Sequence, residues 1–234
     1  MGRAGRLVFV ADLQAPVLDA ADRYHLARVL RLGEGETVRA GDGAGRWRPC
    51  RLNGGGVLEP CGDVVQARVP GPPLAVGIAL TKGVRPELAV QKLTELGIDR
   101  IVLVVAARSV ARWDGERAER HLVRLRRVAR GAARHSQRLH LPEISPVCDF
   151  AQVAAQAGTA LAQPGGGPLT LTTTMVLVGP EGGWADEELA SGLPRIGLGD
   201  GVLRAETAAV AAGALLSALR QGLVVPAVPI GDRP

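Results

Sequence analysis

Short, wholly apolar runs alternate with helix-forming segments through most of the chain, and this alternation constrains the fold more than any other feature. Leu74–Leu80, Ile101–Ala106 and Val176–Val178 have the unbroken apolar character of strands buried on both faces. Three segments have the composition and end signals of longer helices: Pro86–Leu96, Glu116–Arg138 and Ala205–Gln221. Between them we expect helical turns at Asp149–Ala157 and Asp186–Ser191, strands at Ala160–Ala162 and Arg195–Leu198, and a loop over Gln163–Thr174. The pattern predicts an α/β fold with a mostly parallel sheet that is covered on both faces.

The first 70 residues have a different pattern, of short strands separated by glycine-rich turns. The expected strands are Arg6–Val10, Glu36–Ala40, Arg46–Leu52, Val57-Leu58 and Val64–Val69, with a short helix at Asp22–Arg31. Short strands at this spacing predict a small β-barrel. The proline-rich segment Pro70–Pro73 interrupts the chain. We therefore expect one domain over residues 1–70 and a second over residues 74–230.

Composition excludes several classes of protein. No stretch approaches the roughly 18 consecutive apolar residues that a membrane span needs, and the apolar run behind Arg6 is too short for a signal peptide. Cys50, Cys61 and Cys148 form no CxxC pair, and the four histidines have no metal-ligand spacing. We expect a cytoplasmic protein without a membrane segment or a metal site, in which Cys50 and Cys61 are buried thiols.

Basic charge is concentrated in one segment. Between Arg108 and Arg138 there are ten arginines and three acidic residues, a local net charge of +7. Arginines recur there at helical spacings of three and four and so share one stripe: Arg117, Arg120, Arg124, Arg127, Arg134 and Arg138. Leu122, Leu125, Ala129 and Ala132 fall on the opposite side of the helix. Such a face suits the phosphates of RNA. The alternative is a solvated helix face in an arginine-rich protein.

Two glycine-rich turns follow neighbouring strands. Val178–Gly183 precedes the helical turn at Asp186, and Leu198–Gly201 leads toward the last helix. Turns of this kind put bare backbone at the carboxyl edge of a sheet, where open α/β sheets bind ligands. The chain has neither a GxxxxGK[ST] segment nor the third glycine of the dinucleotide fingerprint, which argues against a Rossmann-type oxidoreductase. Ordinary turns without a ligand are the alternative.

Short motifs in a fixed order are spread over nearly the whole chain. They are Tyr24–Arg31, Gly41–Gly43, Lys82-Gly83, Gln91–Gly97, Arg108-Ser109, Ser136–Arg138, Pro142–Ile144, Val178–Gly183 and Leu203–Ala208. Together they resemble the bacterial 16S rRNA uridine-N3 methyltransferases, a branch of the SPOUT class of knotted enzymes. The chain differs from the usual family pattern at Gly201, where arginine is usual, at Ala107, where glutamate is common, and at Arg134-His135, where Glu-Gln is usual.

The resemblance implies an N-terminal PUA-like β-barrel that binds RNA, followed by an α/β domain whose trefoil knot binds S-adenosylmethionine. The implied cofactor pocket consists of Leu161, Gly179, Pro180, Glu181, Gly182, Gly183, Leu198, Gly199, Leu203, Thr207 and Ala208. It also implies a homodimer that acts on 16S rRNA in the 30S subunit. The small residues of the last helix suit the close packing of such a dimer.

Methyl transfer to uracil N3 requires that N3 lose its proton. Arg204 is the expected electrostatic group, and Glu206 is the candidate base, although Glu206 could instead pair with Arg204 or cap the last helix. RNA contacts are expected from Arg28, Arg31, Lys82, Arg108, Arg120, Arg124, Arg127 and Arg138. A tRNA base, a ribose 2′-O or a non-catalytic RNA-binding role are the alternatives that the sequence leaves open.

Overall fold

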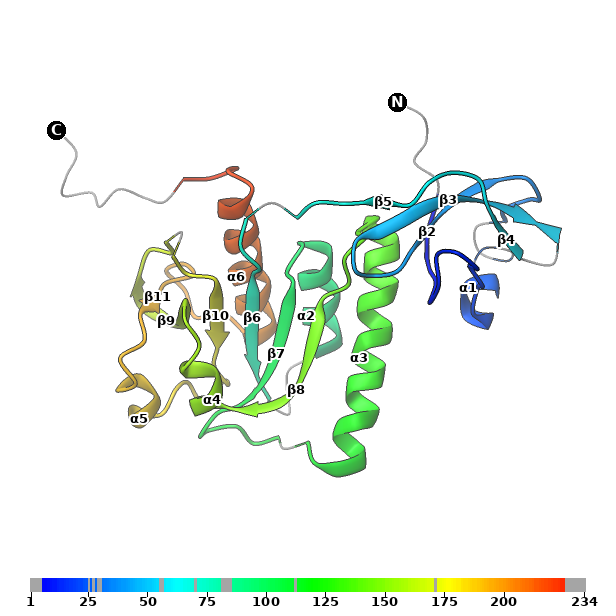
Figure 1. Ribbon diagram of the computed structural model, residues 1–234. Coiled ribbons are helices and arrows are strands. Elements are labelled where there is room, and N and C mark those ends of the chain that lie inside the picture. The colour runs from blue at the N-terminus through cyan, green and yellow to red at the C-terminus, as the bar shows by residue number, and fades with distance from the viewer. Residues whose placement is uncertain are drawn as a thin grey trace. The chain divides into compact units, whose positions relative to one another are not determined.

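The computed structural model describes residues 6–24, 26, 28, 31–54, 57–69, 71–80, 86–111, 113–170 and 172–225 (Figure 1). The chain forms two compact units. The first contains the residues up to Val69 together with Arg130–Leu141, and the second contains Pro70–Ala129 and the residues from Pro142 onward. The segment Arg130–Leu141 therefore belongs to the first unit, although the sequence suggested a second domain that runs without a break from residue 74 to 230.

The first unit is built on a five-stranded sheet. Its elements are β1 (Arg6–Phe9), α1 (Ala20–Tyr24), β2 (Thr37–Gly41), β3 (Arg46–Asn53), β4 (Val57–Pro60) and β5 (Val65–Gln66). The strand order is β1-β2-β3-β4, with β5 paired to β3, and only the β1–β2 pair is parallel among these strands. Its buried core includes Val8, Leu18, Val38 and Leu58. Helix α1 begins two residues before the predicted start at Asp22, and Leu26 and Arg28, further along the predicted segment, are also helical.

The two cysteines of this unit differ in exposure. Cys50 is buried in the core, and burial raises the pKa of its thiol. Cys61 is exposed. The prediction of two buried thiols was therefore wrong for Cys61, which lies just after the last residue of β4.

The second unit contains a six-stranded parallel sheet with the order β11-β9-β10-β6-β7-β8. Its strands are β6 (Ala75–Ala79), β7 (Arg100–Val105), β8 (Glu143–Asp149), β9 (Thr159–Gly167), β10 (Met175–Val178) and β11 (Arg195–Ile196). The helices are α2 (Pro86–Glu95), α3 (Gly115–Ser136), α4 (Phe150–Ala154), α5 (Asp186–Leu189) and α6 (Ala205–Arg220). The α/β class and the mostly parallel sheet predicted from the sequence are confirmed.

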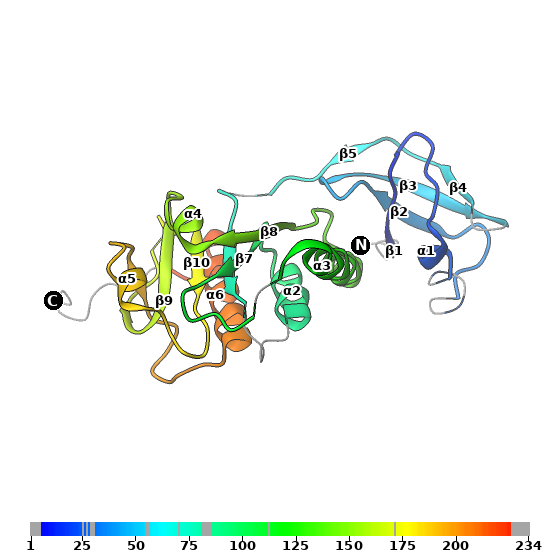
Figure 2. The same cartoon turned by 90° about the horizontal axis from the view of Figure 1, so that it is seen from below.

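Each face of this sheet has its own buried core. Val76 and Ile78 of β6 pack with residues of α2 and α6 on one face, whereas Ala75 and Ala79 pack with Val153 of α4 on the other. Figure 2 shows α2 and α6 on one side of the sheet and α4 on the other. Because successive side chains of a strand point to opposite faces, a strand buried on both must be apolar throughout.

Two strands differ from the prediction. β8 was not expected at all, and β9 continues to Gly167 through a segment that was expected to be a loop. A Cβ on Gly166 would lie only 2.5 Å from the carbonyl carbon of Ile196 in β11. Gly166 therefore allows the backbones of β9 and β11 to approach closely. The glycine-rich composition, from which a loop was predicted, is needed here for the pairing of these two strands.

The small residues of α6 face the interior of the second unit. Ala209, Ala212 and Gly213 are buried, and a Cβ on Gly213 would lie 2.4 Å from Cδ2 of Leu93 in α2. This face of α6 is used for packing within the chain. Ala211, on another side of the helix, is only partly buried within the chain, and dimer packing by α6 stays a prediction.

Candidate functional site

A cavity of about 230 Å³ lies beside the middle of β9, at the carboxyl end of β10 and next to the turn after β11. Its walls come from four chain segments, which contribute Ala162–Pro164, Val178–Glu181 with Gly183 and Trp184, Leu198 with Gly199, and Gly201–Leu203 with Ala205 and Ala208. The carboxyl edge of a parallel sheet is the expected position of a ligand site in an α/β fold. The two glycine-rich turns noted in the sequence meet at this cavity.

The turns require glycine at two positions where φ is positive. Gly183 has a φ of 69° and Gly199 a φ of 140°, conformations that side chains with a Cβ rarely adopt. The first turn is closed by a hydrogen bond of 2.8 Å from the Gly183 N–H to the carbonyl oxygen of Pro180. Backbone groups therefore form a large part of the cavity wall.

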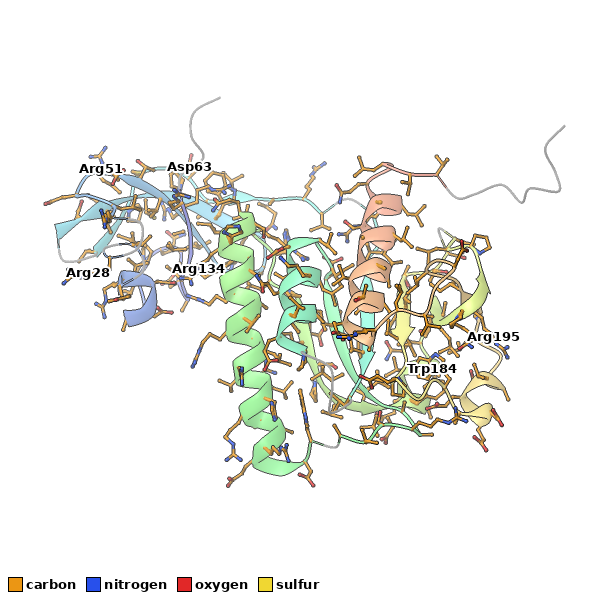
Figure 3. All side chains as sticks on the ribbon, turned by 180° about the vertical axis from the view of Figure 1, so that it is seen from behind. Arg28, Arg51, Asp63, Arg134, Trp184 and Arg195 are labelled. Atoms are coloured by element: carbon orange, nitrogen blue, oxygen red, sulfur yellow. The ribbon has the colours of Figure 1, made fainter. Side chains whose placement is uncertain are left out.

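Trp184, labelled in Figure 3, is itself part of this wall. Its side chain is buried, and its indole Nε1–H donates a hydrogen bond of 3.1 Å to the carbonyl oxygen of Ala162 in the middle of β9. A Cβ on Gly179 would lie 3.0 Å from the Trp184 ring. The tryptophan thus contacts β9 and the turn that follows β10. Trp184 is not among the residues predicted from the sequence, although a large aromatic residue directly after a glycine-rich turn is a usable signal.

Most of the predicted cofactor residues line the cavity. They are Gly179, Pro180, Glu181, Gly183, Leu198, Gly199, Leu203 and Ala208. Leu161, Gly182 and Thr207 do not line it. Leu161 lies wholly inside the core, Thr207 is exposed, and the carbonyl oxygen of Gly182 accepts a hydrogen bond from Arg108. Gln163 and Pro164 also line the cavity but were not predicted, because their segment was expected to be a loop and not part of β9.

The cavity wall carries little charge. Among the described residues that line it, Glu181 alone has a charged side chain, and none is lysine or arginine. Basic side chains, which commonly bind phosphate groups, are therefore missing from the described residues of this wall, although Ala205, the first residue of α6, lines it. A ligand without phosphates, uncharged or cationic, fits these walls better than a dinucleotide.

Arg204 and Glu206 stand at the rim of the cavity and not in its wall. Arg204 is the N-cap residue of α6, is exposed, and accepts the first helical hydrogen bond through its carbonyl oxygen at 2.8 Å from the Ala208 N–H. Its neighbours Leu203 and Ala205 line the cavity, whereas Arg204 and Glu206 do not. The N-cap residue makes no side-chain capping hydrogen bond.

Helix α3 has the two faces that the sequence predicted over its first part. Leu122, Leu125 and Ala129 are buried, and the outward arginines Arg117, Arg120, Arg124 and Arg127 are exposed. Arg124 pairs with Glu87 of α2 at 3.0 Å, and Arg120 pairs with Glu116 at 3.6 Å. These two guanidinium groups keep most of their exposure in spite of the pairing.

The last turns of α3 differ from that pattern. Arg134 is not part of an open face, because it pairs with the buried carboxylate of Asp22 in the first unit (Figure 3). The helix ends at Ser136, where Gln137 takes a left-handed φ of 60°, so Arg138 lies beyond it. The arginine at 134, which departs from the usual family pattern, has a structural role here.

The remaining predicted RNA contacts lie in different places. Arg28 and Arg31 are exposed in the first unit. Arg108 is exposed in the loop after β7, where its Nη1 donates a hydrogen bond of 3.0 Å to the Gly182 carbonyl oxygen. Lys82 lies outside the described residues. Gly201 lines the cavity, and a Cβ there would meet nothing within 4 Å.

Two absences hold for the described part of the chain. None of its helices has the length and hydrophobicity to cross a bilayer. Its described histidine, cysteine, aspartate and glutamate side chains form no group of three or more that could hold a metal ion.

Comparison with known proteins gives matches over both units. A family model described as an RNA methyltransferase domain matches residues 69–217, and one described as an RNA methyltransferase PUA domain matches residues 18–56. The chain is 37% identical over 235 residues to the ribosomal RNA small subunit methyltransferase E of Mycobacterium tuberculosis, with 85% of each protein covered. The protein of that name from Synechocystis is 32% identical, over 92% of this chain and 78% of its own length.

Solved structures agree with these matches. A probable rRNA-methyltransferase from Porphyromonas gingivalis superimposes with a TM-score of 0.81 and 25% identity, over 94% of this chain and all of the other. A ribosomal RNA small subunit methyltransferase E from Neisseria gonorrhoeae, bound to S-adenosyl methionine, gives a TM-score of 0.71 and 25% identity, over 92% and 98% of the two chains. The resemblance drawn from the sequence motifs is confirmed: the chain belongs to the RNA methyltransferase family that includes the ribosomal RNA small subunit methyltransferase E proteins.

Proposed function

We propose that this protein transfers the methyl group of S-adenosylmethionine to N3 of a uridine in 16S ribosomal RNA, within the assembled 30S subunit. Relatives at 37% and 32% identity are named as methyltransferases of the small-subunit ribosomal RNA, and a solved relative was crystallised with the cofactor. The choice of N3 and of the 30S subunit comes from the family resemblance. The protein acts in the cytoplasm, where bacterial ribosomes assemble, and as a homodimer.

The observation that carries the proposal is the chemistry of the cavity wall. S-adenosylmethionine has no phosphate and carries a positive sulfonium, which a wall of backbone groups, apolar side chains and one carboxylate suits. When bound, the cofactor supplies an electrophilic methyl group. In the proposed arrangement the turns at Gly179–Gly183 and Leu198-Gly199 hold it through backbone N–H and C=O groups, and a trefoil knot sets their positions.

Arg204 has the proposed role of stabilising charge on the uracil. As N3 loses its proton, negative charge spreads to the carbonyl oxygens O2 and O4 of the base, and a fixed guanidinium beside them lowers the energy of that state. Its position at the rim, flanked by cavity residues on both sides, supports this role. Glu206, two residues further on, is the proposed proton acceptor.

RNA recognition is assigned to two surfaces. One is the first unit, which contains Arg28 and Arg31 and matches the PUA family model. The other is the exposed arginine face of α3, formed by Arg117, Arg120, Arg124 and Arg127, whose guanidinium groups can neutralise phosphates along an RNA strand.

The proposal is tested by methyl transfer from labelled S-adenosylmethionine to purified 30S subunits that lack the modification, followed by mass spectrometry of the nucleosides. We expect label in 3-methyluridine. Label in another nucleoside would identify a different acceptor atom and overturn the N3 assignment. Binding of cofactor and subunit without any transfer would overturn the catalytic proposal in favour of a non-catalytic relative, and transfer to tRNA alone would replace the substrate.

A further inference from the structure

Two carboxylates are buried among the residues that the structure describes, and they are paired differently. Asp22 is bonded by two arginines, Arg130 and Arg134. Glu188, in helix α5, is only 5% exposed, and each of its carboxylate oxygens accepts a hydrogen bond from a backbone N–H group. The Ala107 N–H donates to Oε1 and the Ala185 N–H donates to Oε2, each at 2.8 Å. Burying an ionised carboxylate costs free energy unless hydrogen bonds or ion pairs compensate for the lost hydration.

The two N–H groups belong to segments far apart in sequence. Ala107 lies in the loop after β7. Ala185 is the N-cap residue of α5, three residues before Glu188, and follows Trp184 directly after the glycine turn that lines the cavity, so its bond fixes the start of the helix behind that turn. A further hydrogen bond connects the loop to the turn: Arg108 Nη1 donates to the carbonyl oxygen of Gly182 at 3.0 Å. The side chain of Arg108 also packs against Gly182, where a Cβ would lie 3.7 Å from the arginine Cβ.

The bonding pattern needs a carboxylate. Each oxygen of an ionised carboxyl group accepts hydrogen bonds, so the group can hold two N–H donors at once. A glutamine of the same shape has one accepting oxygen, and its amide nitrogen would face the second N–H as another donor. The geometry therefore depends on chemistry that only an acidic side chain of this length supplies.

We infer that Glu188 is a positioning residue for the methyl-transfer site, which fixes the loop that carries Arg108 against the glycine turn that lines the cavity. Because it bonds both Ala107 and Ala185, it fixes the position of the Gly179–Gly183 turn and that of the Arg108 side chain. Glu188 itself does not line the cavity. The inference rests on the proposed function in one respect, that the cavity binds S-adenosylmethionine.

The test compares Glu188→Gln with Glu187→Gln in the full-length protein. Glu187 is the neighbouring carboxylate on the same helix and is exposed, so the control variant makes the same chemical change without touching the buried bonds. Two quantities are measured: the dissociation constant for S-adenosylmethionine by calorimetry, and amide hydrogen exchange over residues 106–109 and 182–186. Because the amide of glutamine cannot accept both hydrogen bonds, we expect Glu188→Gln to raise the dissociation constant about tenfold. Exchange should become faster in both segments, and Glu187→Gln should match the wild type.

Unchanged cofactor affinity in a folded Glu188→Gln variant would overturn the inference, as would lost affinity with unchanged exchange at both segments. If this variant does not fold, Arg108→Ala tests the same connection, since it removes the other tie between loop and turn. We expect about a threefold loss of cofactor affinity with faster exchange at residues 182–185, and wild-type values in both would again overturn the inference. If the wild type does not bind S-adenosylmethionine, the proposed function fails, whereas the exchange measurement still decides whether Glu188 joins the two segments.

Discussion

Asp22 and Arg130 form an ion pair at 2.8 Å across 108 residues of sequence. The Asp22 side chain is only 1% exposed and is also bonded by Arg134, while Arg130 in addition donates to the carbonyl oxygen of Phe9 in β1. Ala133, between the two arginines, packs on Leu7 and Phe9. These contacts explain why Arg130–Leu141 belongs to the same compact unit as the N-terminal sheet.

We expect Asp22→Asn to destabilise the protein by about 3 kcal/mol, because it leaves the half-buried Arg134 without its counter-charge and removes one of the two carboxylates that pair with Arg130. The free energy of unfolding from denaturant titration measures the effect. Asp19→Asn is the matched control. Asp19 also pairs with Arg130, at 3.2 Å, but its side chain is 53% exposed, and exposed pairs contribute less than about 1 kcal/mol. Equal losses in the two variants would contradict the importance of the buried pair.

Gly179→Ala should weaken cofactor binding. The new methyl group would stand 3.0 Å from the ring of Trp184, which is buried and hydrogen-bonded to Ala162, so the turn must shift instead. Overpacking of this kind costs about 1–3 kcal/mol, and we expect the dissociation constant for S-adenosylmethionine to rise about tenfold. Gly201→Ala makes the same change in the same cavity wall, where a Cβ meets nothing within 4 Å. It should bind the cofactor like the wild type in the same calorimetric assay.

Asp42 should make the free energy of unfolding depend on pH in the acidic range. Burial by itself raises the pKa of this carboxyl, but hydrogen bonds from the Arg46 side chain and from the Ala44 and Arg46 N–H groups outweigh it, and the net pKa is lowered. A group with a lowered folded-state pKa stabilises the fold above its ordinary pKa and loses that contribution as the pH falls through the lowered value.

Asp42→Asn should therefore cost about 1–2 kcal/mol at neutral pH, and the difference from the wild type should shrink as the pH falls toward about 3. Denaturant titrations over this pH range provide the measurement. Asp63→Asn alters an exposed carboxylate of the same unit and should change stability little at any pH. A difference between wild type and Asp42→Asn that stays constant with pH would contradict the role given to the carboxylate.

The sequence predicted what depends on local pattern and missed what depends on distant partners. β6 was predictable because both of its faces are buried, which leaves an unbroken apolar run. The end of β9 was not, since Gly166 is required by the backbone of β11, which comes much later in the chain. Arg134 has the spacing of the arginine stripe, and nothing local indicates that Asp22 pairs with it. The turns at Gly179–Gly183 and Leu198-Gly199 were predictable as a site because glycine composition is itself a local signal.

Replacing Arg120, Arg124 and Arg127 together with glutamine should weaken RNA binding and flatten its salt dependence. Each phosphate contact of a single strand contributes about 0.7 to the slope of log affinity against log salt, so the slope should fall by about 2 at most. Arg126→Gln is the control, because at helical spacing this residue lies on a different side of α3. Binding to a 16S fragment over a range of salt concentrations gives the slopes. An unchanged slope in the triple variant would favour a solvated face without an RNA role.

Arg204→Ala should abolish methyl transfer and leave cofactor affinity within about tenfold of the wild type. The separation is expected because Arg204 stands at the rim of the cavity while its wall is formed by the neighbouring residues. Its side chain makes no capping hydrogen bond, so helix α6 should form normally in the variant. Arg204→Lys keeps the charge but not the planar guanidinium and should retain part of the turnover. Single-turnover transfer to 30S subunits and calorimetric cofactor binding are measured on the same preparations. Full activity in Arg204→Ala would remove Arg204 from the mechanism, and a loss of cofactor binding equal to the loss of transfer would instead give it a role in holding the cofactor.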